Sequence, residues 1–160
     1  MTQYLSLAFF LLAVVAASAL GAGFETGEWY EQLNKSSLTP PNWVFGPVWA
    51  VIYLLMAVAA WRVWLSGKSM RMGALAWWVI VLVLQVSWSW LMFGLNRPGW
   101  ALGMCGILLG LSIMCLRSFS LVSRPAGTML LPLVIWLAFA TYLNYSIWAL
   151  NGGGLGGILG

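Results

Sequence analysis

Residues 29–35, WYEQLNK, and residues 40–49, PPNWVFGPVW, lie between two long apolar runs of this chain. A simple connector between membrane helices is short, flexible and polar. This stretch is long, stiffened by proline and rich in aromatic side chains, so we expect it to be ordered. An ordered aromatic lid beside a helical bundle indicates a ligand site.

The composition indicates a membrane protein. Of the 160 residues, 62% are hydrophobic and 6% are charged, whereas soluble domains have about 45–50% apolar and about 25% charged residues. Five apolar runs are long enough to cross about 30 Å of hydrocarbon as helices. They lie near residues 3–23, 44–65, 72–93, 100–120 and 128–150. We therefore predict an all-α integral membrane protein, a five-transmembrane-helix bundle with an ordered loop between helices one and two.

One membrane domain accounts for residues 1–150, and the glycine-rich tail at residues 151–160 is expected to be disordered. The first apolar run ends in a sequence that resembles a signal-peptide cleavage site. No Lys or Arg precedes Glu25, however, so the basic region of a signal peptide is missing. We expect this run to be a retained helix.

The basic residues predict an orientation because cytoplasmic loops carry more Lys and Arg. Five lie on the side of the N-terminus and two on the opposite side: Arg62, Lys68, Arg71, Arg117 and Arg124 against Lys35 and Arg97. We expect a cytoplasmic N-terminus, an outward C-terminus and a bacterial inner membrane. The cations are scattered singly at membrane edges, which fits anionic lipid and not nucleic acid.

The sequence offers little for metal or acid–base chemistry. It has no histidine, which excludes histidine-ligated metals and a Ser-His-Asp triad. Cys105 and Cys115 fall in one predicted helix about 15 Å apart, too far for a disulfide. The three acidic residues, Glu25, Glu28 and Glu31, lie in one loop and are interpreted as a solvated face. We expect no metal, no required cofactor and no catalytic residue.

Aromatic and amide side chains form stripes at helical spacing. Trp49 and Tyr53 share a face of the second helix. On the third helix the stripe is Trp78, Val81, Gln85, Trp88 and Met92, and on the fifth it is Pro132, Trp136, Ala140 and Asn144. Gln85 and Asn144 are the carboxamides well inside predicted spans. Each is interpreted either as a hydrogen bond between helices or as a polar anchor for a ligand.

Small residues form a stripe on the fourth helix, at Gly99, Gly103, Gly106 and Gly110. Glycines at this spacing let membrane helices approach closely. The stripe is consistent with a dimer seam or with packing inside one chain, and the spacing does not choose between them.

Three blocks of residues resemble the TspO family of tryptophan-rich sensory proteins and translocator proteins. The family pattern Trp-Tyr-x-x-Leu-x-Lys corresponds to residues 29–35, and its proline- and tryptophan-rich core corresponds to residues 40–49. The third block is the helix-five signature. Its matching residues are Pro132, Trp136, Thr141, Leu143, Asn144 and Tyr145.

The resemblance implies a five-helix bundle, usually a homodimer, with a pocket beneath the first loop walled by helices one, two, three and five. Family members bind porphyrins such as protoporphyrin IX, and in some cases cholesterol. The implied ligand-binding residues are Trp43, Trp49, Tyr53, Gln85, Trp88, Trp136, Ala140 and Asn144. The implied loop and lid residues are Trp29, Tyr30, Lys35, Leu38, Pro40 and Pro41.

The chain departs from the family pattern at three informative positions. Leu38 replaces a tryptophan implicated in light-dependent porphyrin breakdown, and leucine cannot be oxidised in that way. Gln85 replaces an asparagine and keeps the amide. No Lys or Arg follows Tyr145, so the proposed cholesterol motif is broken and sterol binding through it is expected to be poor.

These features predict a membrane receptor or sensor that binds porphyrins and related flat hydrophobic ligands. A transporter of porphyrin or other amphipathic solutes is the first alternative. A porphyrin-degrading enzyme is the second, although Leu38 counts against it. A scaffold whose aromatic residues only pack is the third.

Overall fold

The computed structural model describes residues 2–24 and 27–153. Five long helices form the bundle: α1 (Thr2–Ala22), α3 (Asn42–Leu65), α4 (Arg71–Ser89), α5 (Pro98–Val122) and α7 (Leu131–Leu150). Three short helices complete the described part of the chain: α2 (Gly27–Gln32), the π-helix η1 (Trp90–Gly94) and α6 (Arg124–Thr128). Five segments are long and apolar enough to cross a membrane. The predicted all-α, five-helix membrane bundle is confirmed.

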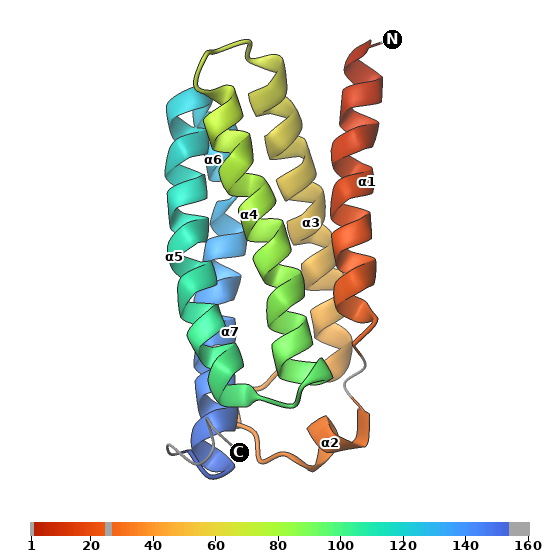
Figure 1. Ribbon diagram of the computed structural model, residues 1–160, viewed down its shortest axis with the longest axis vertical. Coiled ribbons are helices and arrows are strands. Elements are labelled where there is room, and N and C mark those ends of the chain that lie inside the picture. The colour runs from red at the N-terminus through yellow and green to blue at the C-terminus, as the bar shows by residue number, and fades with distance from the viewer. Residues whose placement is uncertain (1, 25–26, 154–160) are drawn as a thin grey trace.

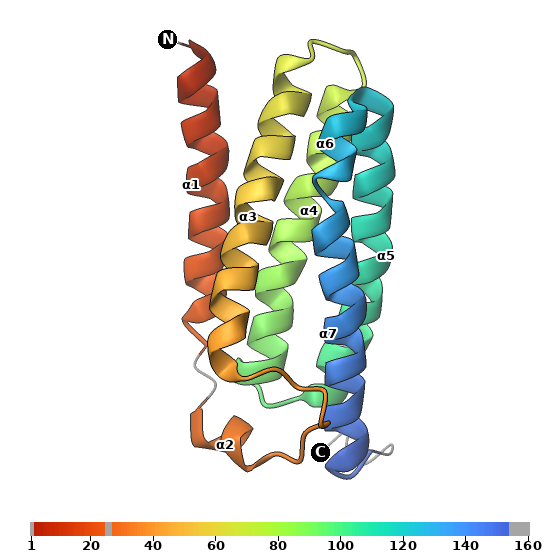
Figure 2. The same ribbon diagram turned by 180° about the vertical axis from the view of Figure 1, so that it is seen from behind.

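The helices run along one common axis (Figures 1 and 2). Helix α1 packs on α3 and α4, α4 packs on α5, and α5 packs on α7 and α6. The start of α1, the α3–α4 turn and the α5–α6 junction lie at one end (Figure 1), here called the N-terminal end. Helix α2, the α4–α5 turn and the end of α7 lie at the other, the loop end.

Prolines mark where helices begin after a turn. Pro98 opens α5, while Pro125 and Pro132 each occupy the first turn of α6 and α7. Proline suits this position because backbone N–H groups in the first turn of a helix have no partner within the helix, so the N–H that proline lacks is not needed. The predicted span at residues 128–150 corresponds to α7, and the short helix α6 precedes it within the same apolar segment, Arg124–Leu150.

A buried apolar core lies between the long helices. Small buried residues of α3, including Ala57 and Ala60, let α4 approach, and the large ring of Trp78 fills the remaining space. The Trp78 indole N–H donates to the Met56 carbonyl oxygen at 3.1 Å. This is how a tryptophan deep in an apolar core satisfies its donor.

The loop after α2 is fastened to α7 at the loop end. The Asn151 side chain accepts the Asn34 N–H at 2.9 Å and donates to the Asn34 carbonyl at 2.8 Å. The Ser36 and Tyr142 hydroxyls are 3.1 Å apart. These hydrogen bonds hold the loop after α2 against α7 and the residue that follows it. Most of the tail expected to be disordered, residues 154–160, lies outside the described residues.

The glycine stripe of α5 does not serve close packing inside this chain. A Cβ added at Gly103, Gly106 or Gly110 would meet no atom within 4 Å, and all three residues are exposed. The stripe presents an open face of α5.

Candidate ligand-binding site

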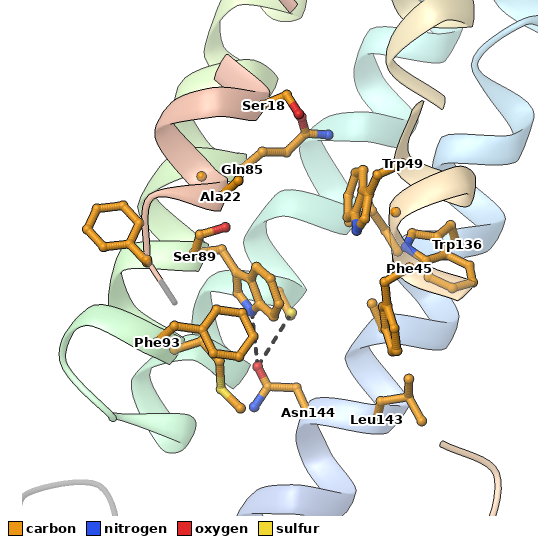
Figure 3. A pocket seen from close by; sticks show the side chains of 18 of the residues that line it. Ser18, Ala22, Phe45, Trp49, Gln85, Ser89, Phe93, Trp136, Leu143 and Asn144 are labelled. Carbon is orange, nitrogen blue, oxygen red and sulfur yellow. Dashed lines mark hydrogen bonds between the residues drawn. The ribbon is translucent and has the colours of Figure 1, made fainter. Parts of the chain in front are cut away.

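A cavity of about 690 Å³ lies at the loop end of the bundle. Its walls come from α1, α3, α4, η1, α5 and α7 (Figure 3). Gly27 and Tyr30 of α2 also line it. Small-molecule sites in proteins have volumes of about 300–1,000 Å³. The predicted ligand-binding residues that line it are Trp49, Tyr53, Gln85, Trp88, Trp136, Ala140 and Asn144.

The remaining predicted residues lie elsewhere. Trp43 is 75% exposed and does not line the cavity. Of the predicted lid residues, Tyr30 lines the cavity, whereas Leu38 is 62% exposed and points away from the protein interior. Trp29, Lys35, Pro40 and Pro41 are not lining residues either.

Aromatic rings make most of the wall, and they contact one another in pairs. The Trp49 and Tyr53 rings on α3 have centroids 5.5 Å apart at 32°. The Phe45 ring meets Trp136 of α7 at 5.8 Å, nearly edge to face, which joins α3 to α7 in one wall of the cavity. Such pairs hold rings in fixed orientations, so the wall offers preformed apolar faces to a flat ligand.

Asn144 is fully engaged with neighbouring helices. Its side-chain oxygen accepts the Trp88 indole N–H at 3.0 Å, and the Cys105 thiol lies 3.7 Å from the same oxygen. Its amide nitrogen donates to the Pro98 carbonyl at 2.8 Å. Asn144 therefore connects α7 to α4 and to the start of α5, as the interpretation of a hydrogen bond between helices requires.

Gln85 is different. It is 4% exposed, and its side-chain oxygen has no hydrogen-bond partner among the described residues. Its nitrogen has one weak partner, the Met56 sulfur at 3.9 Å. A buried polar atom without a partner is unfavourable by about 1–3 kcal/mol. Gln85 lines the cavity (Figure 3), so a buried acceptor without a partner belongs to a residue of the cavity wall.

Tyr30 lines the cavity on the loop side, and Lys35, which does not line it, lies against the Tyr30 ring. The Tyr30 ring packs edge to face on Phe93 with centroids 5.5 Å apart. Burial raises the pKa of the Tyr30 hydroxyl, so it stays protonated at neutral pH. The Lys35 ammonium lies 4.4 Å from the centroid of the Tyr30 ring, and it donates to the Glu31 and Leu33 carbonyls at 3.3 and 3.4 Å. A cation is thus held next to the cavity.

The sequence did not indicate which residues of helix one line the cavity, and it did not indicate that the fourth membrane helix lines it. Ser18 and its neighbours on α1 line the cavity, although no residue there had been singled out. Cys105 and Leu108 also line it, which adds the fourth membrane helix to the walls. Their three-residue spacing puts Cys105 and Leu108 on one face of α5. An apolar face that lines a cavity has the same sequence pattern as one that packs on a neighbouring helix, so the spacing does not identify a cavity wall.

Within the described residues, no group of three or more metal-ligating side chains is present.

Comparison with known proteins agrees with this architecture. The model of the TspO/MBR family matches residues 8–149. The chain is 38% identical over 152 residues to Protein CrtK of Rhodobacter capsulatus, covering 91% of this chain and 92% of that protein. It is 34% identical to the human translocator protein, with 92% and 91% covered. Identity to the tryptophan-rich sensory protein of Cereibacter sphaeroides is 34%, with 89% of each covered. The chain therefore belongs to the TspO/MBR family and is an integral membrane protein of the sensor and translocator type.

Proposed function

We propose that this protein is a membrane receptor that binds porphyrins, such as protoporphyrin IX, and related flat hydrophobic ligands in the cavity under the first loop. The observation that carries the proposal is the pairing of aromatic walls with the unpartnered Gln85 oxygen. A large flat ligand gains from burial against indole rings. A donor on the ligand would remove the cost of the unpaired buried acceptor.

Polar groups on two sides of the cavity suit an amphipathic tetrapyrrole. Gln85 lies in a membrane-spanning helix and lines the cavity together with Trp49, while Lys35 lies at the loop end beside Tyr30. A ligand carboxylate at the loop would gain a charge-assisted hydrogen bond from the Lys35 ammonium. A free-base porphyrin meets both requirements through its pyrrole N–H groups and its propionates. No cofactor is required, and the porphyrin is the ligand.

We also propose a homodimer through the α5 stripe. Gly103, Gly106 and Gly110 are open within the chain, and in a membrane an open row of small residues suits close approach of a second helix. The proposed orientation places the N-terminal end in the cytoplasm of a bacterial inner membrane, because that end has five of the seven cations.

The test is a titration of the purified protein in detergent with protoporphyrin IX, followed by quenching of tryptophan fluorescence. The variant Trp49→Ala removes one ring from the cavity wall. It should weaken protoporphyrin IX binding at least about tenfold if the ring contributes about 1.4 kcal/mol. The control is Trp64→Ala, which removes an exposed tryptophan from the N-terminal end and should leave affinity unchanged. Equal affinities for the wild type and Trp49→Ala would refute the site.

A further inference from the structure

A second hollow lies at the N-terminal end, far along the bundle from the aromatic cavity. It has a volume of about 580 Å³ and lies between the end of α3, the α3–α4 turn and the end of α5. Arg62 and Lys68 line it together with the apolar side chains of Trp61, Leu65 and Val122. We call it the basic hollow.

The cations around the basic hollow are not equivalent. The Lys68 ammonium donates to the Val122 carbonyl at the end of α5. Arg71 donates to the Trp64 carbonyl at 3.2 Å and stacks on the Trp64 ring, with 5.0 Å to its centroid. Both therefore satisfy carbonyl groups that helix C-termini leave free. Arg62 is exposed and has no hydrogen-bond partner among the described residues, although it has five N–H donors.

No acidic side chain described by the structure can neutralise this end of the protein. Glu28 and Glu31 belong to α2, at the opposite end of the bundle (Figure 1). Arg117 and Arg124 add further positive charge near the basic hollow. The local field is positive, and the partner it favours is an anion.

The surroundings indicate an anion with an apolar tail. The basic hollow lies at the end of two membrane-spanning helices, at the level where lipid headgroups meet hydrocarbon. Leu65 lines it and is 42% exposed, so an acyl chain could continue from the hollow along the outer surface of α3. The Trp61 indole N–H donates to the Gln3 carbonyl at 3.1 Å, which fixes this ring as a wall.

We propose that the basic hollow binds the phosphate headgroup of an anionic phospholipid from the surrounding leaflet. The Arg62 guanidinium donates to the phosphate oxygens, Lys68 adds a second charge, and an acyl chain packs beside Leu65. Basic pockets between membrane helices bind such headgroups for this physical reason. The site is separate from the porphyrin pocket, and its occupancy does not depend on that ligand.

Native mass spectrometry of the detergent-solubilised protein tests the proposal. Phosphatidylglycerol and phosphatidylcholine with identical acyl chains are titrated separately, and inorganic phosphate is added in a third series. We expect phosphatidylglycerol to bind more tightly than phosphatidylcholine, and phosphate alone to compete poorly. The variant Arg62→Gln should bind phosphatidylglycerol about tenfold more weakly, because it loses a charged hydrogen bond.

Arg117→Gln is the matched control, since it removes the same charge from the same end but does not line the hollow. It should retain selective binding, and the melting temperatures of both variants should equal that of the wild type. Equal binding of the two lipids, equal loss in both variants, or full retention by Arg62→Gln would overturn the proposal. Competition by phosphate as strong as that by the lipid would show that the acyl chain has no part.

Discussion

At the scale of single residues, Gln85 and Asn144 have the same functional group in one cavity but different surroundings. Asn144 has partners for both ends of its amide, on α4 and at the start of α5. The Gln85 oxygen has none among the described residues. The hydrogen bonds of Asn144 fit a contact between helices, whereas the oxygen of Gln85 without a partner is the basis of the proposed ligand anchor.

Replacing Asn144 should affect stability first. The variant Asn144→Leu leaves the Trp88 N–H and the Pro98 carbonyl without their partner, at a cost of about 1–3 kcal/mol for each buried group. We expect a clearly lower melting temperature in detergent, measured by intrinsic fluorescence. Gln85→Leu is the control and should melt at or above the wild-type temperature, since it removes an unpaired acceptor. A wild-type melting temperature for Asn144→Leu would contradict this assignment.

At the scale of elements, the loop after α2 depends on a contact with the end of α7. One side chain, Asn151, pairs with both backbone groups of Asn34. In Asn151→Ala these bonds are lost, so amide hydrogen exchange at Asn34 should become about tenfold faster. Ser69→Ala, in the turn at the opposite end, is the control. If exchange at Asn34 did not change, other contacts would be holding the loop.

Close packing at the junction of α5 and α6 predicts that a larger residue at Gly127 lowers the stability of the protein. A Cβ at Gly127 would lie 2.0 Å from the Ser120 Oγ and 2.9 Å from the Ser120 Cα. Gly127→Ala must push these helices apart, which costs about 1–3 kcal/mol in a packed core. Gly103→Ala has open space around it and should melt like the wild type. Similar melting temperatures for both variants would show that the junction relaxes freely.

At the scale of the whole molecule, the aromatic cavity lies at the loop end of the bundle and the basic hollow at the N-terminal end. The exposed glycines of α5 lie on its outer surface, where we propose the dimer interface. Gly106→Leu should convert a homodimer to monomers without changing the melting temperature of the monomer. Light scattering after size exclusion chromatography measures this. A dimer that survives the substitution would place the interface on another face.

The sequence predicted the five spans because apolar length alone determines them, and it predicted the buried stripe of α4 because helical spacing places Gln85 and Trp88 near one face. Trp43 was included on the resemblance alone, and it is exposed and does not line the cavity. Trp43 and Trp49 are six residues apart, which is about 120° around a helix. The partners of Asn144 could not be predicted, since Pro98 and Trp88 are distant in sequence and meet it only after the helices pack.

The proposed role of Gln85 as an anchor for porphyrin is tested most directly by measuring the protoporphyrin IX affinity of Gln85→Leu and of the wild type. Leucine fills similar space without the unpaired oxygen, so the protein should keep its melting temperature. Its affinity for protoporphyrin IX should fall about tenfold, as expected for loss of one hydrogen bond of about 1.4 kcal/mol. Unchanged affinity in a fully folded variant would contradict the claim that the spare acceptor of Gln85 serves the ligand.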